Sequence, residues 1–226
     1  VCRIGTTVDL NITDSDGDLS TVYYRWDSQT WAVLPAPYDT TIPSGDGTHI
    51  LDVNATDSAG HCALATYSFV CDDTPPTITL NSPASGSTIK SGTAIDLDVN
   101  DTNGVSTVLY NWDGNANHTL LAPYDVSTTG LSEGTHILYV YANDTVDNWQ
   151  GTQYTFTVDD TPPTITLNSP ADGAEIQPGV MIDLDVNDTN DINSVWYAWD
   201  SGTNTTLPSP YDVSTAGLSD GLHTLS

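Results

Sequence analysis

Basic residues are almost absent from this chain. Its 226 residues include 3 Lys and Arg residues against 30 Asp and Glu residues, which gives a formal net charge of −27. Such a surface repels phosphate backbones and anionic headgroups, so nucleic acid and anionic membranes are excluded as partners. No run of about 18 apolar residues occurs, and no membrane insertion of this segment is expected.

Glutamate and helical periodicity are also scarce. Only Glu133 and Glu175 are glutamates, which leaves 30 − 2 = 28 aspartates. Aspartate favours turns and hard-cation sites, whereas exposed helix surfaces favour glutamate. No segment shows a helical period of useful length. The composition therefore indicates a chain without helices.

The chain is built from an internal repeat. The block Asp-Asp-Thr-Pro-Pro-Thr-Ile-Thr-Leu-Asn-Ser-Pro-Ala begins at Asp72 and again at Asp159, an offset of 159 − 72 = 87 residues. Trp-Asp, Pro-Tyr-Asp and Gly-x-His each occur three times at matching positions. We predict three domains: residues 1–71 without a first strand, residues 72–158 complete, and residues 159–226 without the last strands. Such ragged repeats are expected of a window from a longer array.

Alternating apolar residues predict the fold. Ile95, Leu97 and Val99 alternate with polar residues, which is the period of a half-buried strand. About seven such runs, separated by Pro, Gly, Asn and Asp clusters, fit in each repeat. Trp112 and its counterparts are expected to point inward from the third strand. The predicted fold class is all-β, with tandem immunoglobulin-like β-sandwiches.

Several motifs carry a family resemblance. Residues 131–144 resemble the tyrosine corner of immunoglobulin and fibronectin type III domains, with His49, His136 and His223 in place of the tyrosine. We expect each histidine to bond corner backbone rather than a metal. Together with the Asp-Thr-Pro-Pro linker and Tyr-x-Trp-Asp, the whole chain resembles tandem Ig-like repeats of archaeal and bacterial cell-surface proteins. The resemblance implies an extracellular location and a spacer, stalk, adhesin, surface-layer or filament role.

Cysteine occurs only in the first repeat, so a repeat-wide metal site of cysteines is excluded. In a sandwich, Cys2 and Cys71 would reach the same end of the domain, which predicts a disulfide between them. Cys62 lies nearly a strand length from Cys71, roughly 30 Å at about 3.3 Å per residue, and would be free or pair elsewhere. An oxidising compartment is indicated.

Aspartate and asparagine gather in loops that should meet at one end of each sandwich. Several like charges there would repel each other, and Ca²⁺ accepts six to eight oxygen ligands, so we predict Ca²⁺ between repeats. The alternative is that these residues only shape turns. An EF-hand beginning at Asp14 is rejected because its twelfth position is Arg25. The candidate ligands are Asp72, Asp73, Asp101, Asn103, Asp144, Asp147, Asp159, Asp160, Asp188, Asn190, Asp14, Asp16 and Asp57.

Seven Asn-x-Ser/Thr sequons predict N-linked glycans. They begin at Asn11, Asn54, Asn100, Asn117, Asn143, Asn187 and Asn204. Those on strands or at strand ends, which are all except Asn117 and Asn204, have outward parity, as glycan carriers require. Plain surface asparagines would satisfy the same parity.

The chain carries no pattern of a catalytic site. Carboxylate pairs such as Asp96 and Asp98 lie on a predicted solvated face rather than in a pocket. We predict a non-enzymatic extracellular structural protein of a cell-surface layer, sheath or filament, most simply archaeal, with copies of itself or flanking repeats as partners. The alternative is an adhesin or glycan-binding stalk that uses outward aromatics such as Tyr139, Tyr141 and Trp196. A third class is an accessory region of a secreted enzyme.

Overall fold

The computed structural model of this protein describes all residues from 1 to 226. Every regular element is a β-strand, which confirms the all-β fold class, and no helix suited to crossing a membrane is found. The chain divides into two compact units. The first comprises Val1–Ser87, Gly92–Gly130 and Thr135–Phe156, and the second Thr88–Ser91, Leu131–Gly134 and Thr157–Ser226. The three-domain division stays a prediction, and repeats 1, 2 and 3 denote residues 1–71, 72–158 and 159–226.

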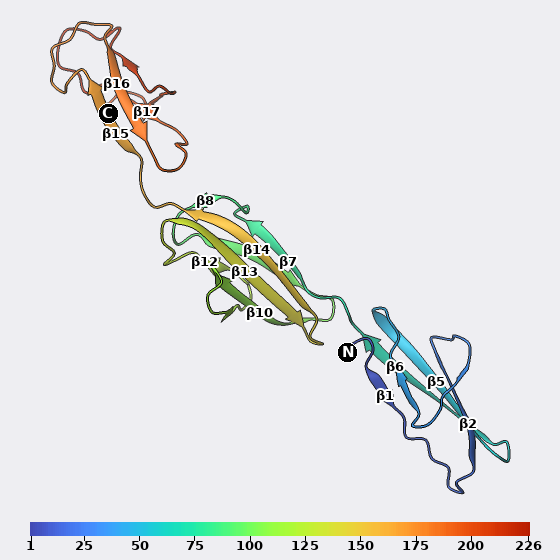
Figure 1. The fold of residues 1–226 in the computed structure, drawn as a ribbon. Coiled ribbons are helices and arrows are strands. Elements are labelled where there is room, and N and C mark those ends of the chain that lie inside the picture. Colours follow the sequence, from blue (N-terminus) through green and yellow to red (C-terminus); the bar gives the residue numbers. More distant parts are fainter. The chain divides into compact units, whose positions relative to one another are not determined.

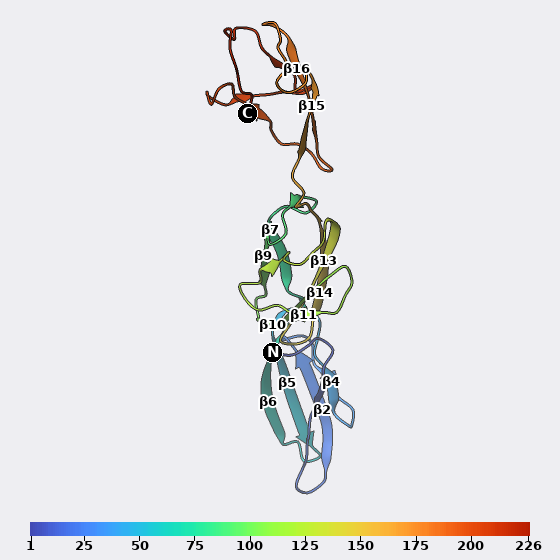
Figure 2. The same ribbon diagram turned by 90° about the vertical axis from the view of Figure 1, so that its left-hand side faces the viewer.

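Repeat 1 is a sandwich of two antiparallel sheets. Its large sheet has the strand order β3-β2-β5-β6, and β2, β5 and β6 lie side by side in Figure 1 and Figure 2. Its small sheet pairs β1 with β4. The strands are β1 Thr7–Asp9, β2 Leu19–Trp26, β3 Ala32–Val33, β4 Asp39–Thr41, β5 Gly47–Asp57 and β6 Cys62–Cys71.

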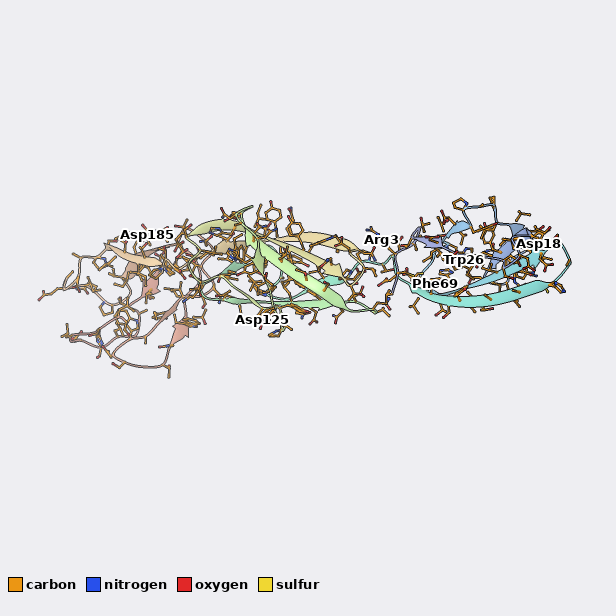
Figure 3. All side chains as sticks on the ribbon, turned by 90° about the horizontal axis from the view of Figure 1, so that it is seen from below. Arg3, Asp18, Trp26, Phe69, Asp125 and Asp185 are labelled. Atoms are coloured by element: carbon orange, nitrogen blue, oxygen red, sulfur yellow. The ribbon has the colours of Figure 1, made fainter.

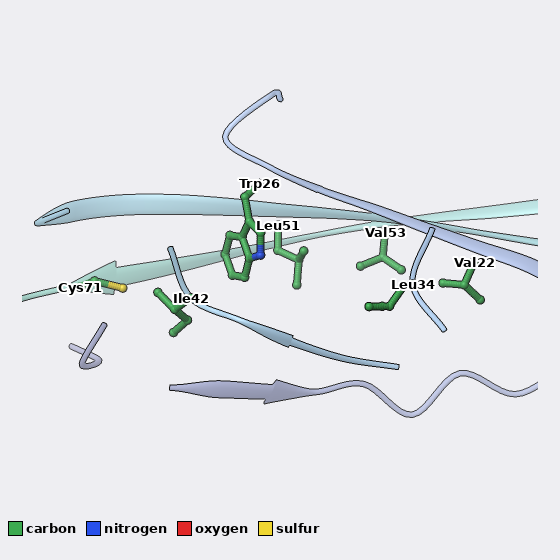
Figure 4. Packing of buried hydrophobic residues seen from close by; sticks show 7 residues of the cluster. All are labelled: Val22, Trp26, Leu34, Ile42, Leu51, Val53 and Cys71. Carbon is green, nitrogen blue, oxygen red and sulfur yellow. The ribbon is translucent and has the colours of Figure 1, made fainter. Parts of the chain in front are cut away.

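Alternate side chains of the two sheets fill the space between them. Trp26 on β2 and Leu51 on β5 are buried together with Ile42, which follows β4 (Figure 4). The centroids of the Trp26 and Phe69 rings lie 5.6 Å apart, and both side chains lie inside repeat 1 in Figure 3. The Trp26 indole N–H donates a hydrogen bond to the Thr40 hydroxyl at 3.2 Å. The predicted inward tryptophan is therefore both packed and hydrogen-bonded, as a buried indole requires.

Repeat 2 has the same arrangement with additional strands. One sheet has the order β11-β10-β13-β14-β8 and the other β12-β9-β7. Strand β8 belongs to the second unit, where it pairs in parallel with Thr157 and Val158 at the end of β14. The strands are β7 Thr77–Ser82, β8 Thr88–Ile89, β9 Ala94–Asn100, β10 Val105–Trp112, β11 His118–Thr119, β12 Val126–Ser127, β13 Gly134–Asp144 and β14 Trp149–Val158.

Strand β9 shows why these segments form sandwiches. Ile95 and Leu97 are 0% exposed and Val99 is 5% exposed, whereas Asp96 and Asp98 between them are exposed. A strand turns successive side chains to opposite faces, so this alternation places every aliphatic group in the core. A register slip of one residue would bury the aspartates instead, which fixes the pairing.

All strands of repeat 3 lie in the second unit. They form a sheet of order β15-β16-β19 and a pair β17-β18 around buried Ile182, Leu207 and Val213. Ile165 and Leu167 on β15 are exposed. The strands are β15 Thr164–Ser169, β16 Met181–Asn187, β17 Trp196–Tyr197, β18 Thr205–Thr206 and β19 Val213–Ser214.

His49 closes the corner at which β5 begins. Its Nδ1 lies 2.7 Å from the Asp27 carboxylate and its Nε2 lies 2.8 Å from the Gly45 carbonyl oxygen. Both partners are acceptors, so both ring nitrogens must donate and the ring is an imidazolium. The hydrogen bond with Asp27, and then that with Gly45, raises the pKa of His49, while the bond from His49 lowers the pKa of Asp27. The predicted backbone contact is confirmed.

The same ion pair recurs in the other repeats. His136 Nδ1 lies 2.7 Å from the Asp113 carboxylate, and His223 Nδ1 lies 2.6 Å from the Asp200 carboxylate. Each aspartate belongs to a Trp-Asp motif and each histidine to a Gly-x-His motif. The two motifs are therefore the two halves of one contact, and their joint recurrence was the sequence signal for it.

The thiols of Cys2 and Cys71 are neighbours. Their Sγ atoms lie 2.7 Å apart, and the two residues form an isolated parallel bridge. Both are free thiols in this structure, and burial, followed by the contact with Cys2, raises the pKa of Cys71 to about 12. Cys62 is exposed at the opposite end of β6. The geometry suits the predicted pair, and the disulfide itself stays a prediction.

We expect stability to fall at alkaline pH because of the corner ion pairs. A histidine whose pKa is raised by folding contributes stability below its unfolded pKa of about 6.5, and this contribution is lost as pH rises through the folded value. Calorimetric Tm should therefore decline as pH rises above neutrality. His49→Gln should flatten this decline in part, whereas His118→Gln, at an exposed position, should leave it unchanged. An identical decline in His49→Gln would contradict the assignment.

Oxidised glutathione should convert the Cys2 and Cys71 thiols to a disulfide, with reduction of the glutathione to two thiol molecules. Closing a loop of 71 − 2 = 69 residues is expected to stabilise repeat 1 by about 4 kcal/mol through the unfolded state. Peptide mapping by mass spectrometry should find Cys2 linked to Cys71, and Cys62→Ser should not alter the product. A linkage that involves Cys62 would show that the predicted pairing is wrong.

Candidate metal centre

Three aspartate carboxylates converge where the linker after repeat 1 meets two loops of repeat 2. Asp72, Asp101 and Asp144 each offer an oxygen atom, and these atoms lie within 4.8 Å of one another. Asp72 is 2% exposed and Asp144 is 1% exposed, while Asp101 is half-buried. None of the ion pairs in the structure involves these residues. Buried carboxylates are normally paired with a cation, so this group requires an explanation.

The first loop orients Asp101. This residue follows β9 directly, and its Oδ1 accepts hydrogen bonds from the N–H groups of Asn103 at 2.7 Å and Gly104 at 2.9 Å. Gly104 has a φ of 106°, which a residue with a side chain rarely adopts. The turn thus holds Oδ1 by backbone donors and leaves Oδ2 available as a ligand.

The second loop holds Asp144 in its charged form. Its Oδ1 accepts from the N–H groups of Val146 at 2.8 Å and Asn148 at 2.9 Å, and its Oδ2 accepts from Asn148 Nδ2 at 2.7 Å. Burial raises the pKa of Asp144, but these hydrogen bonds together outweigh burial and leave the pKa below its ordinary value. Asp144 is therefore a carboxylate at neutral pH, although its side chain is out of water.

The linker supplies the third carboxylate. Asn148 Nδ2 also donates to the main-chain oxygen of Asp72 at 3.1 Å, so one amide group bonds both the loop and the linker. The Asp72 N–H donates to the Cys2 carbonyl oxygen at 3.0 Å, and its Oδ1 accepts from the Thr74 N–H at 3.2 Å. Asp72 Oδ2 is buried and has no hydrogen-bond partner. This unpartnered oxygen is carried by one of the three carboxylates of the group.

The electrostatics of the group favour a bound cation. Two unit charges about 5 Å apart repel by about 3 kcal/mol at an effective dielectric constant of about 20, and three such pairs are present. An unpartnered buried oxygen adds a further desolvation cost. A divalent cation with oxygen preference would remove both penalties, and Ca²⁺ accepts carboxylates, carbonyls and water in flexible geometry. The donor set therefore fits calcium.

Repeat 1 has a related group at the end of the domain that lies opposite Arg3. Oxygen atoms of Asp14, Asp18 and Asp57 lie within 4.8 Å of one another, and Figure 3 shows Asp18 and Arg3 at opposite ends of repeat 1. By the 87-residue offset, Asp14 and Asp57 correspond to Asp101 and Asp144. None of the three is buried, and Asp57 pairs with His61 at 2.8 Å. This group lacks the unpartnered buried oxygen of the first one.

Several other predicted ligands form hydrogen bonds outside the two three-carboxylate groups. Asp73 is exposed, and its N–H donates to the Asp46 carboxylate at 2.7 Å. Asp147 accepts from Asn143 Nδ2 at 3.0 Å and from the Trp149 indole at 2.7 Å. Outside both three-carboxylate groups lie Asp73, Asp147, Asp16, Asp159, Asp160 and Asp188. The N–H groups of Asn103 and Asn190 donate to Asp101 and Asp188, and a ligand role for their side chains stays a prediction. The bridging role of Asn148 was not predicted, because sequence gives no sign of which loop amide reaches the linker.

One glycosylation prediction is corrected by the structure. Asn143 is 8% exposed and its Nδ2 donates to Asp147, so the nitrogen that would carry a glycan is enclosed. The acceptor of this bond, Asp147, lies in the loop between β13 and β14. Asn54 is only half-exposed. The exposed sequon residues are Asn11, Asn100, Asn117, Asn187 and Asn204.

A family model and several solved structures are similar to this chain. The family model for the bacterial Ig domain matches residues 76–158 and 163–226. No curated protein sequence matches the chain. Solved structures with a similar fold include fibronectin(III)-like modules of Clostridium thermocellum CbhA, at 21% identity, 69% of this chain, 87% of that chain and a TM-score of 0.37.

Two bacterial adhesins are also among the similar structures. A 1.5-MDa bacterial ice-binding adhesin shares 15% identity over 88% of this chain and 77% of that chain, with a TM-score of 0.34. A Ca²⁺-stabilized adhesin of an Antarctic bacterium shares 17% identity over 93% of this chain and 64% of that chain, with a TM-score of 0.31. These low scores carry no functional argument, and the family match alone decides the assignment.

We expect Asn148→Ala to destabilise repeat 2. The substitution removes the donor to both Asp144 and the Asp72 main chain, and two buried acceptors left without partners should cost about 3 kcal/mol. Hydrogen exchange of β13 and β14 amides should accelerate accordingly. Asn103→Ala serves as the matched control, since only the backbone of Asn103 supports the site. Equal exchange rates in both variants would contradict the bridging role.

Proposed function

Since the chain belongs to the bacterial Ig domain family, we propose that it is an extracellular structural protein whose repeats form part of a cell-surface layer, sheath or filament. The observation that carries this proposal is the hydrogen-bonded junction at Asp72. The main chain of this linker residue bonds Cys2 of repeat 1 through its N–H and Asn148 of repeat 2 through its carbonyl oxygen. Near-identical units that engage their linker in this way suit a mechanical role.

Calcium completes the proposed junction. The ligands are Asp72 Oδ2 from the linker and the carboxylates of Asp101 and Asp144 from two loops of the next repeat. A bound Ca²⁺ would neutralise the negative charge of this group. It would also connect the linker at Asp72 to the two loops that carry Asp101 and Asp144. Because the ligands come from separate segments, binding should couple linker order to loop order.

The proposed partners are copies of the same repeat. Ig-like domains typically lack catalysis, and we assign the chain a structural rather than an enzymatic role. N-linked glycans on the exposed sequon asparagines would suit the same extracellular setting.

An adhesin or glycan-binding stalk is the second candidate. It is favoured by aromatic side chains that the fold leaves uncovered, since Trp149 is 49% exposed and Trp196 is 58% exposed. The indole of Trp149 is held by its hydrogen bond to Asp147, which presents the ring in a fixed pose. Exposed aromatic rings of this kind can stack on sugars. Binding to a glycan array that is lost in Trp149→Ala would favour this candidate.

Calcium should raise the Tm of the intact chain. At a free concentration of 100 times Kd the stabilisation is about 2.7 kcal/mol, and a chelator should reverse it. Asp72→Asn should lose most of the shift, whereas Asp73→Asn, the adjacent exposed carboxylate, should retain it. The junction site is wrong if Asp72→Asn responds to Ca²⁺ as strongly as the unaltered chain.

Electron microscopy of native surface material tests the structural role. Ordered layers, sheaths or filaments that carry this repeat are expected, and they should loosen on chelation of Ca²⁺. Isolated rods without lateral order, together with glycan binding, would replace the structural role by the adhesin.

A further inference from the structure

An acidic side chain of repeat 1 binds the linker between β6 and β7. Asp46 lies in the loop between β4 and β5, directly before the Gly-x-His motif. Its Oδ1 accepts a hydrogen bond from the Asp73 N–H at 2.7 Å, and its Oδ2 accepts one from the Thr74 hydroxyl. The bonds from Thr74 and then from Asp73 lower the pKa of Asp46, so it is charged at neutral pH. One carboxylate therefore binds two successive residues of the linker.

Thr74 connects this acceptor to Asp72. The Thr74 hydroxyl donates to Asp46, and the Thr74 N–H donates to Asp72 Oδ1 at 3.2 Å. A single linker residue thus joins an exposed loop carboxylate to a buried one. The bond from Thr74 occupies Oδ1 of Asp72, and Oδ2 is the buried oxygen without a hydrogen-bond partner. Asp46 and Thr74 therefore fix which oxygen of Asp72 stays available.

The same set of bonds recurs at the linker after repeat 2. Glu133 is the counterpart of Asp46, since 46 + 87 = 133, and it also precedes a Gly-x-His motif. Its Oε1 accepts from the Asp160 N–H at 2.7 Å and from the Thr161 hydroxyl at 3.0 Å. The Thr161 N–H donates to Asp159 Oδ1 at 3.2 Å. The contact is thus a property of the repeat, and aspartate and glutamate both provide it.

The loop that carries Asp46 is itself fixed by the corner. Gly45 and Gly47 flank Asp46 with φ values of 118° and 119°, a conformation that residues with side chains rarely adopt. The carbonyl oxygen of Gly45 lies 2.8 Å from His49 Nε2. Asp46 is exposed, so its position depends on these backbone constraints rather than on burial of its side chain.

We propose that Asp46 is a positioning residue of the calcium site and acts through Thr74 on the carboxylate of Asp72. This role rests on the proposed calcium junction. Without the two bonds of Thr74, the Asp72 side chain would gain rotational freedom, and Ca²⁺ would have to order it on binding at a cost in conformational entropy. Residues that orient a metal ligand typically contribute about 10- to 100-fold to metal affinity.

Calorimetric titration of the intact chain with Ca²⁺ tests this role. Asp46→Ala and Thr74→Val should each weaken binding by about 10-fold or more, although neither removes a proposed ligand. Thr74→Val leaves the charge unchanged, so its effect cannot come from electrostatic attraction. The double variant should bind about as weakly as Asp46→Ala alone, because both changes break the same connection.

Two variants serve as matched controls for the titration. Asp46→Glu should bind Ca²⁺ like the unaltered chain, because Glu133 makes the equivalent bonds at the next linker. Glu133→Ala should also bind Ca²⁺ like the unaltered chain, since the threonine that Glu133 accepts from orients Asp159 and not Asp72.

Measurements in chelator separate positioning from a general effect on folding. Asp46 and Thr74 are exposed, so water can replace their lost bonds and the Tm of both variants in chelator should be unchanged. Hydrogen exchange of the Thr74 amide should nevertheless accelerate in Asp46→Ala, which reports the linker contact without the metal.

Three results would overturn the role of Asp46. They are Ca²⁺ affinities of Asp46→Ala and Thr74→Val equal to that of the unaltered chain, a Tm in chelator that falls together with the affinity, and an unaltered rate of Thr74 amide exchange in Asp46→Ala. Failure of the calcium junction gives a different result, because the unaltered chain itself would then not bind Ca²⁺, and the positioning role would fall with it.

Discussion

The structure depends on one constraint, which is that each strand must bury one face against a second sheet. Strand β9 meets it with three aliphatic residues at a spacing of two, and the aspartates between them stay in solvent. Because strands of fixed length run from one end of the sandwich to the other, their loops collect at the two ends. The positions of the acidic loops are a consequence of this packing and not of any attraction between them.

Aspartate carboxylates are stabilised in two different ways in this chain. At the corners, the exposed Asp27 and its counterparts each pair with a histidine, and the positive charge of the His49 imidazolium balances the charge of Asp27 within the fold. At the linker, Asp144 is stabilised by N–H donors and Asp72 has an oxygen with no partner at all. Hydrogen-bond donors lower the pKa of a carboxylate but do not cancel its charge. This difference is why the linker group, and not the corner, points to an external cation.

The internal repeat allows equivalent positions of repeats 1 and 2 to be compared within one molecule. Repeats 1 and 2 share the aliphatic pattern, the corner ion pair and the order of four strands in their larger sheets. In repeat 2, β7 pairs with β9 along residues 96–100, and Leu97 is fully buried there. The pairing of an edge strand thus completes the burial that the alternation begins.

The sequence by itself determined the repeat, the strand alternation, the inward tryptophan and the gathering of aspartates at loop positions. These features are local or periodic, and a periodicity of two is enough to assign the face of a side chain. Only the tertiary structure decided that Asp72, Asp101 and Asp144 meet while Asp73 and Asp147 turn away, that Asn148 bridges them, and that Asn143 is enclosed despite its outward parity. Those outcomes depend on the course of loops between distant strands, where a carboxylate can bond its own backbone or face a neighbour, and parity carries no information on which occurs.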